Sequence, residues 1–252
     1  YHKWWYAKRD HDKNHICEFG SVDGTLVAAA WESGMDNAIR FDGTKMLQNG
    51  PDAWSTDQES VDLNAYLSLE YTLLKKFAAL LDEPFLLPDY RSMVADYFFD
   101  KKDGFFYDRR MNATRDFVRE AGCEGYIPFW ANIATKEQFA KARKLLDNKK
   151  KFSTYIPFPT IAADNPKYDP KGYWRGPIWL DQTYYGIKGY RNYGEGKKAD
   201  AYTDQVFRNI EGLTEGAPIY ENYDTHTGKP MQASHFSWSA ACLLMLYNDY
   251  GK

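Results

Sequence analysis

The chain has 252 residues, of which 44% are hydrophobic and 17% aromatic, so it can bury a sizeable core. Its formal net charge of −3 gives no electrostatic footprint for nucleic acid or for an anionic membrane. Three widely separated cysteines, without Cys/His metal spacing, argue against a disulfide framework and against a zinc site. No apolar run approaches the length of a membrane span. We therefore expect one domain over residues 1–252.

The first polar motif begins at residue 10. Oxygen-bearing side chains recur at Asp10, Asp12 and Asn14, and the backbone carbonyl of Ile16 continues the alternation. Calcium loops take ligands at alternate positions because this hard cation prefers about six to eight oxygens. The motif lacks the glycine and the terminal carboxylate of a full EF-hand, so it needs a carboxylate from elsewhere in the chain. The alternative is an ordinary polar turn, in which Asp and Asn bond to nearby backbone groups.

The next candidate is a loop with an indole and two carboxylates, which come from Trp31, Glu32 and Asp36. It lies within residues 20–60, a Gly-, Asp- and Ser-rich stretch that predicts loop with short helical pieces. Apolar neighbours and the nearby Glu32 would both raise the pKa of Asp36, which is what a general acid requires. The alternative is that Asp36 caps a short helix over residues 37–41.

Apolar periodicity, capping residues and prolines predict six or seven helices, the first of them ending in the N-terminal residues. The others span residues 61–81, 88–99, 135–146, 177–193, 199–210 and 234–250. Long aromatic and Gly/Pro-rich loops join them, and a connection as long as residues 153–176 is typical of a functional rim. Since no alternating strand pattern is present, the sequence predicts an all-α fold of helical hairpins packed side by side.

A loop-to-helix junction at residues 173–182 combines two indoles, a guanidinium and a carboxylate. Trp174 and Trp179 offer ring faces, while Arg175 and Asp181 offer charged hydrogen-bonding groups. This combination suits the faces and hydroxyls of sugars. The alternative places Trp179 in the core and pairs Arg175 with Asp181.

Near the far end of the chain, Glu221 is followed by Asn222 and Tyr223. A general base must be an ionised carboxylate within hydrogen-bond reach of the water that it activates, and these neighbours could orient it. The alternative is an exposed loop glutamate. Hydrolysis of a bond between sugars usually uses two carboxylates on opposite sides of that bond. Asp36 and Glu221 are therefore candidates for such a pair.

Several of these stretches together resemble glycoside hydrolase family 63, the family of processing α-glucosidase I and its bacterial relatives, which is kin to the trehalases. They are Trp-Glu-Ser-Gly-Met-Asp-Asn at 31–37, Tyr-Trp-Arg-Gly-Pro-Ile-Trp-Leu-Asp-Gln at 173–182, Glu-Asn-Tyr at 221–223 and Phe-Ser-Trp-Ser-Ala at 236–240. The resemblance implies an (α/α)6 toroid and an inverting, exo-acting α-glycosidase. On the matching positions it makes Asp36 the general acid and Glu221 the general base.

The resemblance also implies a calcium site and part of a larger enzyme. Bacterial members hold calcium at the motif that matches Arg9-Asp10-His11-Asp12, and the distant carboxylate would come from Glu59. A complete toroid has about twelve helices, so the chain resembles the C-terminal part of the catalytic domain. We expect its partner to be the missing N-terminal half of the same enzyme. We also expect a periplasmic or secreted bacterial protein rather than a cytoplasmic one.

We thus expect an α-glucosidase that acts on an α-linked gluco-oligosaccharide or disaccharide. The residues expected to contact the sugar are Trp31, Glu32, Trp174, Arg175, Trp179, Asp181, Tyr223 and Trp238. One alternative is the same chemistry with another specificity, such as trehalose, mannosylglycerate or a gluco-galactoside. The other alternative is a non-catalytic toroid fragment that binds carbohydrate.

Overall fold

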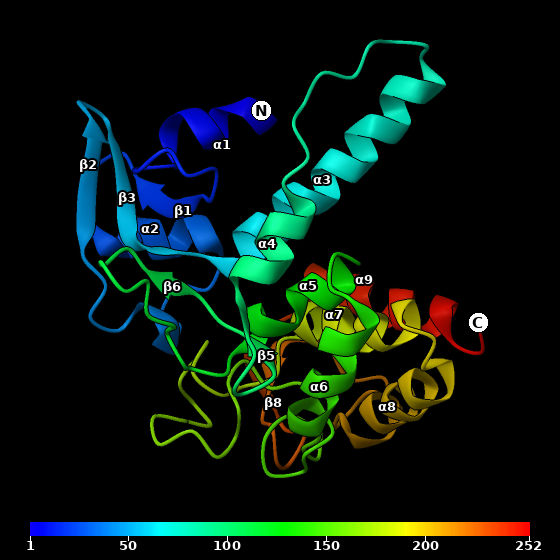
Figure 1. Cartoon of the computed structure of the whole chain (residues 1–252). Helices are drawn as coiled ribbons and strands as arrows, with labels where there is room; N and C mark the ends of the chain where they lie inside the picture. Colours follow the sequence, from blue (N-terminus) through cyan, green and yellow to red (C-terminus); the bar gives the residue numbers. More distant parts are fainter.

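A computed structural model describes residues 1–252 and shows a mostly helical molecule with three small antiparallel sheets (Figure 1). The α-helices are α1 (His2–Lys8), α2 (Leu26–Ser33), α3 (Val61–Leu80), α4 (Arg91–Tyr97), α5 (Ile127–Trp130), α6 (Lys136–Leu146), α7 (Leu180–Asn192), α8 (Gly196–Asn209) and α9 (Ser237–Asp249). Two 3-10 helices, η1 (Ile39–Phe41) and η2 (Cys123–Tyr126), follow the α2 loop and precede α5. None of the helices is both long and apolar enough to cross a membrane.

The helices agree well with the expected periodicity. The prediction of 61–81 is confirmed by α3, and 135–146 is confirmed by α6, where Thr135 and Gln138 form a reciprocal capping box. The helix expected from residue 88 begins only at Arg91, since Pro88 lies outside it. Helices α7, α8 and α9 fall within a few residues of their expected bounds. Helix α2 was expected only as a short piece within the loop-rich stretch.

The all-α prediction is only roughly right, because the chain also forms eight strands. They are β1 (Glu18–Ser21), β2 (Met46–Gly50), β3 (Ala53–Glu59), β4 (Phe99–Asp100), β5 (Phe105–Phe106), β6 (Arg109–Arg110), β7 (Tyr220–Tyr223) and β8 (Pro230–Ser234). The largest sheet has the order β1-β3-β2, with β6 added to β3, and β7 pairs with β8 in a hairpin. Strand β3 was not predicted, because no alternation of apolar residues marks it in the sequence. Its buried side chains are polar, as at Ser55, Thr56 and Gln58.

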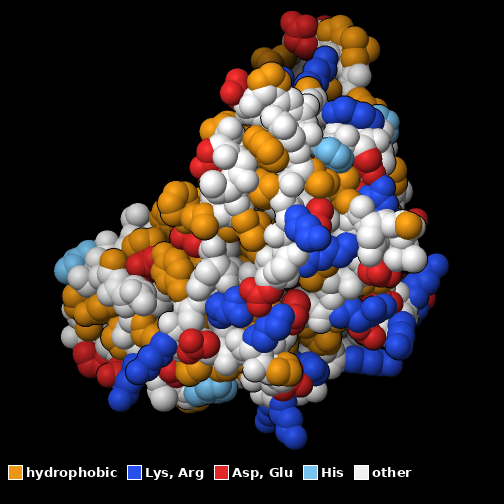
Figure 2. Space-filling model, turned by 90° about the vertical axis from the view of Figure 1, so that its left-hand side faces the viewer, with side chains coloured by type: hydrophobic (Ala, Val, Ile, Leu, Met, Phe, Trp, Pro, Cys, Tyr) orange, Lys and Arg blue, Asp and Glu red, His pale blue; other side chains and the backbone are white.

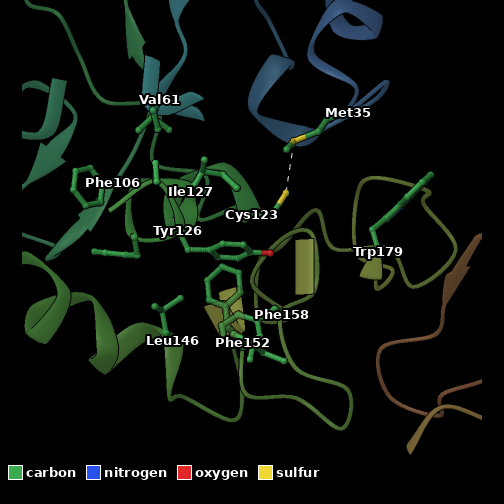
Figure 3. Close-up of a cluster of buried hydrophobic side chains, with 14 of the residues drawn as sticks. Met35, Val61, Phe106, Cys123, Tyr126, Ile127, Leu146, Phe152, Phe158 and Trp179 are labelled. Carbon is green, nitrogen blue, oxygen red and sulfur yellow. Dashed lines mark hydrogen bonds between the residues drawn. The ribbon is translucent and has the colours of Figure 1, made fainter. Parts of the chain in front are cut away.

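Aromatic rings build the core around the 3-10 helix η2. The Tyr126 ring meets Phe152 and Phe158 nearly edge to face, with centroids 5.9 and 5.5 Å apart. Figure 3 shows these rings packed beneath the loop that follows α2, where the Cys123 thiol lies 3.6 Å from the Met35 thioether. Because Met35 is buried, this contact fixes the α2 loop to the core.

Next to this core lies a buried ion cluster of one arginine and three carboxyl groups. The Arg40 guanidinium donates to both oxygens of Asp62 at 2.8 and 2.7 Å, and to Asp108 at 3.3 Å. Glu124 is also buried, and its charge interacts with that of Arg40. These groups join η1, the start of α3, the segment after β5, and η2. Burial raises the pKa of Glu124 to about 8, and the negative charges of Asp108 and Asp62 act in the same direction. The single positive charge of Arg40 only partly offsets this rise.

The Glu124 carboxyl group makes stability depend on pH. Its pKa in the folded chain is above the unfolded value of about 4.3, so this contribution to stability is complete below pH ~4 and is lost as the pH rises through about 8. We expect Glu124→Gln to remove this loss. Between pH 5 and pH 8.5, the free energy of unfolding should then fall less than in the parent, by on the order of 3 kcal/mol. Urea unfolding at both pH values measures the difference.

The matched control is Glu137→Gln, since Glu137 is an exposed residue of α6 that pairs only with Lys141. It should leave the pH dependence unchanged. An equal loss of stability in the parent and in Glu124→Gln would contradict the assignment.

Candidate active site

Asp36 follows α2 at a sharp turn. Gly34 ends the helix in the left-handed conformation, with φ at 75°, which glycine adopts without steric cost. The chain then buries Met35 and leaves Asp36 partly exposed beside it. The alternative role of Asp36 as a helix cap is wrong, because η1 begins after Ala38 and has no side-chain cap.

The electrostatic surroundings of Asp36 favour a proton donor. Desolvation raises the pKa of its carboxyl group, and the negative charge of Glu221 raises it further. The two carboxylates, 185 positions apart in the sequence (221 − 36), therefore lie close enough to influence one another. The sequence predicted that Asp36 and Glu221 belong to one site, and this prediction requires the two carboxyl groups to lie near one another.

Glu221 lies on β7, not in an exposed loop. The β7–β8 register shifts between Tyr220 and Asn222, so Glu221 occupies an irregularity of the kind that redirects a side chain. One carboxylate oxygen accepts a hydrogen bond from the Tyr173 hydroxyl at 2.7 Å, and the other accepts from the Ala233 amide at 3.3 Å. The carboxylate thus has a fixed orientation.

Asn37 fastens the Asp36 loop to the aromatic junction before α7. Its side-chain amide donates to the Gly172 carbonyl, and its side-chain oxygen accepts from the Trp174 amide, both at 3.0 Å. Arg175 adds a hydrogen bond to the Asn37 carbonyl and pairs with Asp42 at 2.9 Å. The alternative pairing of Arg175 with Asp181 is wrong, since this guanidinium pairs with Asp42 and braces the loop. Contact of Arg175 with sugar stays a prediction.

The four tryptophans that were expected to contact sugar fall into two groups, one buried and one exposed. Trp174 and Trp179 are only 3% and 2% exposed and stack on each other at 4.0 Å, so the prediction that both present open faces to sugar is wrong. Trp31 and Trp238 are 63% and 57% exposed, and the Trp238 ring lies 6.5 Å from that of Trp179. Open aromatic surface is therefore supplied by these two rings.

Two further residues expected at the sugar have structural partners. The Glu32 carboxylate accepts hydrogen bonds from the Arg9 guanidinium at 2.8 Å and from the Gly20 amide at 2.6 Å. These bonds connect α2 to the end of α1 and to β1. Tyr223 is buried, and its hydroxyl accepts the Tyr220 amide at 2.9 Å. These contacts give both residues a structural role, and their contact with sugar stays a prediction.

Asp181 stays open as a candidate. It lies in the first turn of α7, accepts a hydrogen bond from Gln182 at 3.1 Å, and has its pKa raised by desolvation. No cation pairs with it, in contrast to the predicted ion pair with Arg175.

The acidic loop gathers a second group of carboxylates. Oxygens of Asp10, Asp12 and Glu18 all lie within 4.8 Å of one another. Asp10 also closes its own turn by accepting the amides of Asn14 at 3.0 Å and His15 at 3.2 Å. Glu18 is fully buried and one of its oxygens has no hydrogen-bond partner. Glu18 was not predicted as a ligand, although it continues the alternation of residues 10, 12, 14 and 16 by one more step.

Glu59, the distant carboxylate expected in this cluster, lies beside the loop, and its role as a metal ligand stays a prediction. Glu59 pairs with Glu18 across β1 and β3, and accepts the Asn14 side-chain amide at 2.6 Å. The guanidinium of Arg115 pairs with Glu59 at 2.9 Å and also with Asp12. Arg115 is therefore the positive group that offsets this concentration of acids, and no motif around it predicts this role.

Comparisons with known proteins indicate the family of the chain. Residues 1–239 match the family model described as a mannosylglycerate hydrolase MGH1-like glycoside hydrolase domain. The chain is 24% identical to mannosylglycerate hydrolase of Thermus thermophilus, covering 97% of this chain and 67% of that protein. It is 25% identical to mannosylglycerate hydrolase MGH1 of Selaginella moellendorffii, covering 98% of this chain and 58% of that protein.

A solved structure shares the fold. The family 63 mannosylglycerate hydrolase from Thermus thermophilus in complex with glucose superposes with a TM-score of 0.76 and 20% identity, over 98% of this chain and 66% of that one. This chain thus spans about three fifths to two thirds of the length of such proteins. Together with the family match, these findings show that the chain belongs to the MGH1-like group of glycoside hydrolase family 63.

Proposed function

We propose that the protein containing this chain is an inverting α-glycosidase in which Asp36 is the general acid and Glu221 the general base. The observation that carries the proposal is the pairing of a carboxyl group of raised pKa with a second, oriented carboxylate at one site. Asp36 protonates the leaving oxygen, while Glu221 takes a proton from the water that attacks the opposite face of the sugar.

The favoured substrate is an α-linked mannosylglycerate, in place of the α-glucosidase specificity expected from the sequence. Both the matching family and the two relatives bear that name. An α-glucoside is the second candidate, because the structure with which the chain superposes was solved with glucose. The alternative of a non-catalytic fragment that binds carbohydrate is disfavoured. Binding through aromatic rings alone would not need two carboxyl groups whose charges influence one another.

The projecting end of α3 is the proposed contact with the remainder of the enzyme. Leu73, Phe77 and Leu80 are exposed along one side of this helix, and the end of the helix extends away from the body of the molecule (Figures 1 and 2). An exposed apolar stripe of this kind is usually covered by another surface. The match covers 67% and 58% of the two relatives, and the remaining residues of a protein of that length could supply such a surface.

A structural calcium ion is proposed at the acidic loop. The donor set fits a hard cation: Asp10, Asp12 and Glu18 supply converging carboxylate oxygens, and Glu18 has one buried oxygen without a partner. The carbonyl of Ile16 accepts no hydrogen bond from the protein. Asn14 and Glu59 complete the proposed set. The ion would add to the positive charge of Arg115, which already pairs with Asp12 and Glu59, and would brace β1 against β3.

The first prediction concerns the anomer of the product. NMR during hydrolysis of mannosylglycerate and of a panel of α-glucosides should detect the β-sugar first, because water attacks opposite to the leaving group. Asp36→Asn and Glu221→Gln should each lower kcat by at least about 100-fold. First release of the α-anomer, or retained activity in either variant, contradicts the assignment.

The second prediction concerns the acidic loop. Millimolar calcium should raise the Tm of the chelator-treated protein by about 5–10 °C, since an ion that binds only the folded state stabilises it. Calorimetry measures the shift. Glu18→Gln should abolish it, while the exposed-site control Glu137→Gln keeps it. A Tm that is insensitive to calcium in the parent counts against the site.

A further inference from the structure

Tyr173 connects the two halves of the candidate active site. Its hydroxyl donates to Oε1 of Glu221 at 2.7 Å. Its two neighbours in the chain, Gly172 and Trp174, are the residues to which Asn37 is bonded. Since Asn37 follows Asp36 directly, a short path of hydrogen bonds and covalent bonds runs from the acid, through the Tyr173 turn, to the base.

The backbone of Tyr173 is held in an unusual conformation. Its φ is 64°, in the left-handed region that bulky residues rarely adopt. The Trp179 indole donates to the Tyr173 carbonyl at 3.1 Å, and the Tyr173 ring meets the Trp179 ring edge to face at 5.1 Å. Non-glycine residues persist in this region where surrounding contacts determine the geometry, and such positions cluster at active sites.

The hydroxyl of Tyr173 stays protonated across the working range of a glycosidase. Desolvation raises its pKa above the ordinary value, as do the hydrogen bond to Glu221 and the charges of Glu221 and Asp36. Tyr173 can therefore only donate to the carboxylate.

We propose that Tyr173 is a positioning residue that fixes Glu221 against Asp36 and leaves Oε2 as the oxygen that accepts the proton. Oε1 is occupied by the short bond from Tyr173, whereas Oε2 has only a long contact of 3.3 Å with the Ala233 amide. This inference rests on the proposed function. In the reaction, a water proton passes to Oε2 and the water oxygen bonds to the anomeric carbon. The glycosidic bond breaks, and the leaving oxygen receives the proton of Asp36.

The test is Tyr173→Phe in the whole protein, which removes one oxygen and keeps the ring. We expect kcat to fall about 10- to 100-fold, as for loss of a hydrogen bond to a charged group, with KM changed less than about threefold. The acidic limb of the pH profile of kcat/KM should move to higher pH, because the ionised carboxylate has lost a donor. A merely structural role would not move this limb.

The matched control is Tyr193→Phe, whose hydroxyl donates to the Ala134 carbonyl at 2.6 Å and has no bond to the site. It should lower Tm without changing the pH profile. An unshifted profile with full kcat in Tyr173→Phe, while Glu221→Gln is inactive, overturns the role of Tyr173 and leaves the proposed function standing.

A second measurement separates the two proposals where the parent hydrolyses no glycoside. The side-chain carboxyl carbon of Glu221, identified by its disappearance in Glu221→Gln, is titrated by NMR. Its transition should lie at higher pH in Tyr173→Phe than in the parent, and Tyr193→Phe should match the parent. Identical transitions in all three proteins contradict the inference, whatever the activity.

Discussion

The buried ion cluster around Arg40 is the interaction on which the rest of the site depends. This arginine lies four residues after Asp36 and binds the first turn of α3 through Asp62 and the segment after β5 through Asp108. Breaking such a pair leaves uncompensated buried charges, which typically costs about 3–5 kcal/mol. Its geometry therefore sets where the α2 loop lies, and with it the position of the proposed general acid.

The second constraint is the way three distant segments meet. Asn37 holds the turn before α7, that turn presents Tyr173, and Tyr173 holds a carboxylate on the irregular strand β7. Each step is a short polar contact backed by stacked rings. A site assembled in this way keeps its two carboxylates at a set separation without a ligand, which is the preorganisation that acid–base catalysis needs.

The sequence predicted the elements whose signals are local. The apolar period marks α3 and the capping box marks α6, and both formed as expected. It missed β3, whose inward side chains are polar, and it could not tell that Trp174 and Trp179 cover one another, because stacking depends on tertiary contacts. The proposed acid and base were predicted from their motifs, whereas Tyr173 and Arg115 contact partners far away in the chain. The calcium ion and the extracytoplasmic location stay predictions.

The most direct test of the central claim is the distance between the Asp36 and Glu221 carboxyl groups, in a crystal structure of the protein with an unreactive substrate analogue bound. An inverting pair leaves room for a water molecule, so the account predicts a separation of about 6.5–9.5 Å. A separation of about 5–5.5 Å belongs to a retaining enzyme with a covalent intermediate. That result would contradict the assignment of Glu221 as the base that activates water.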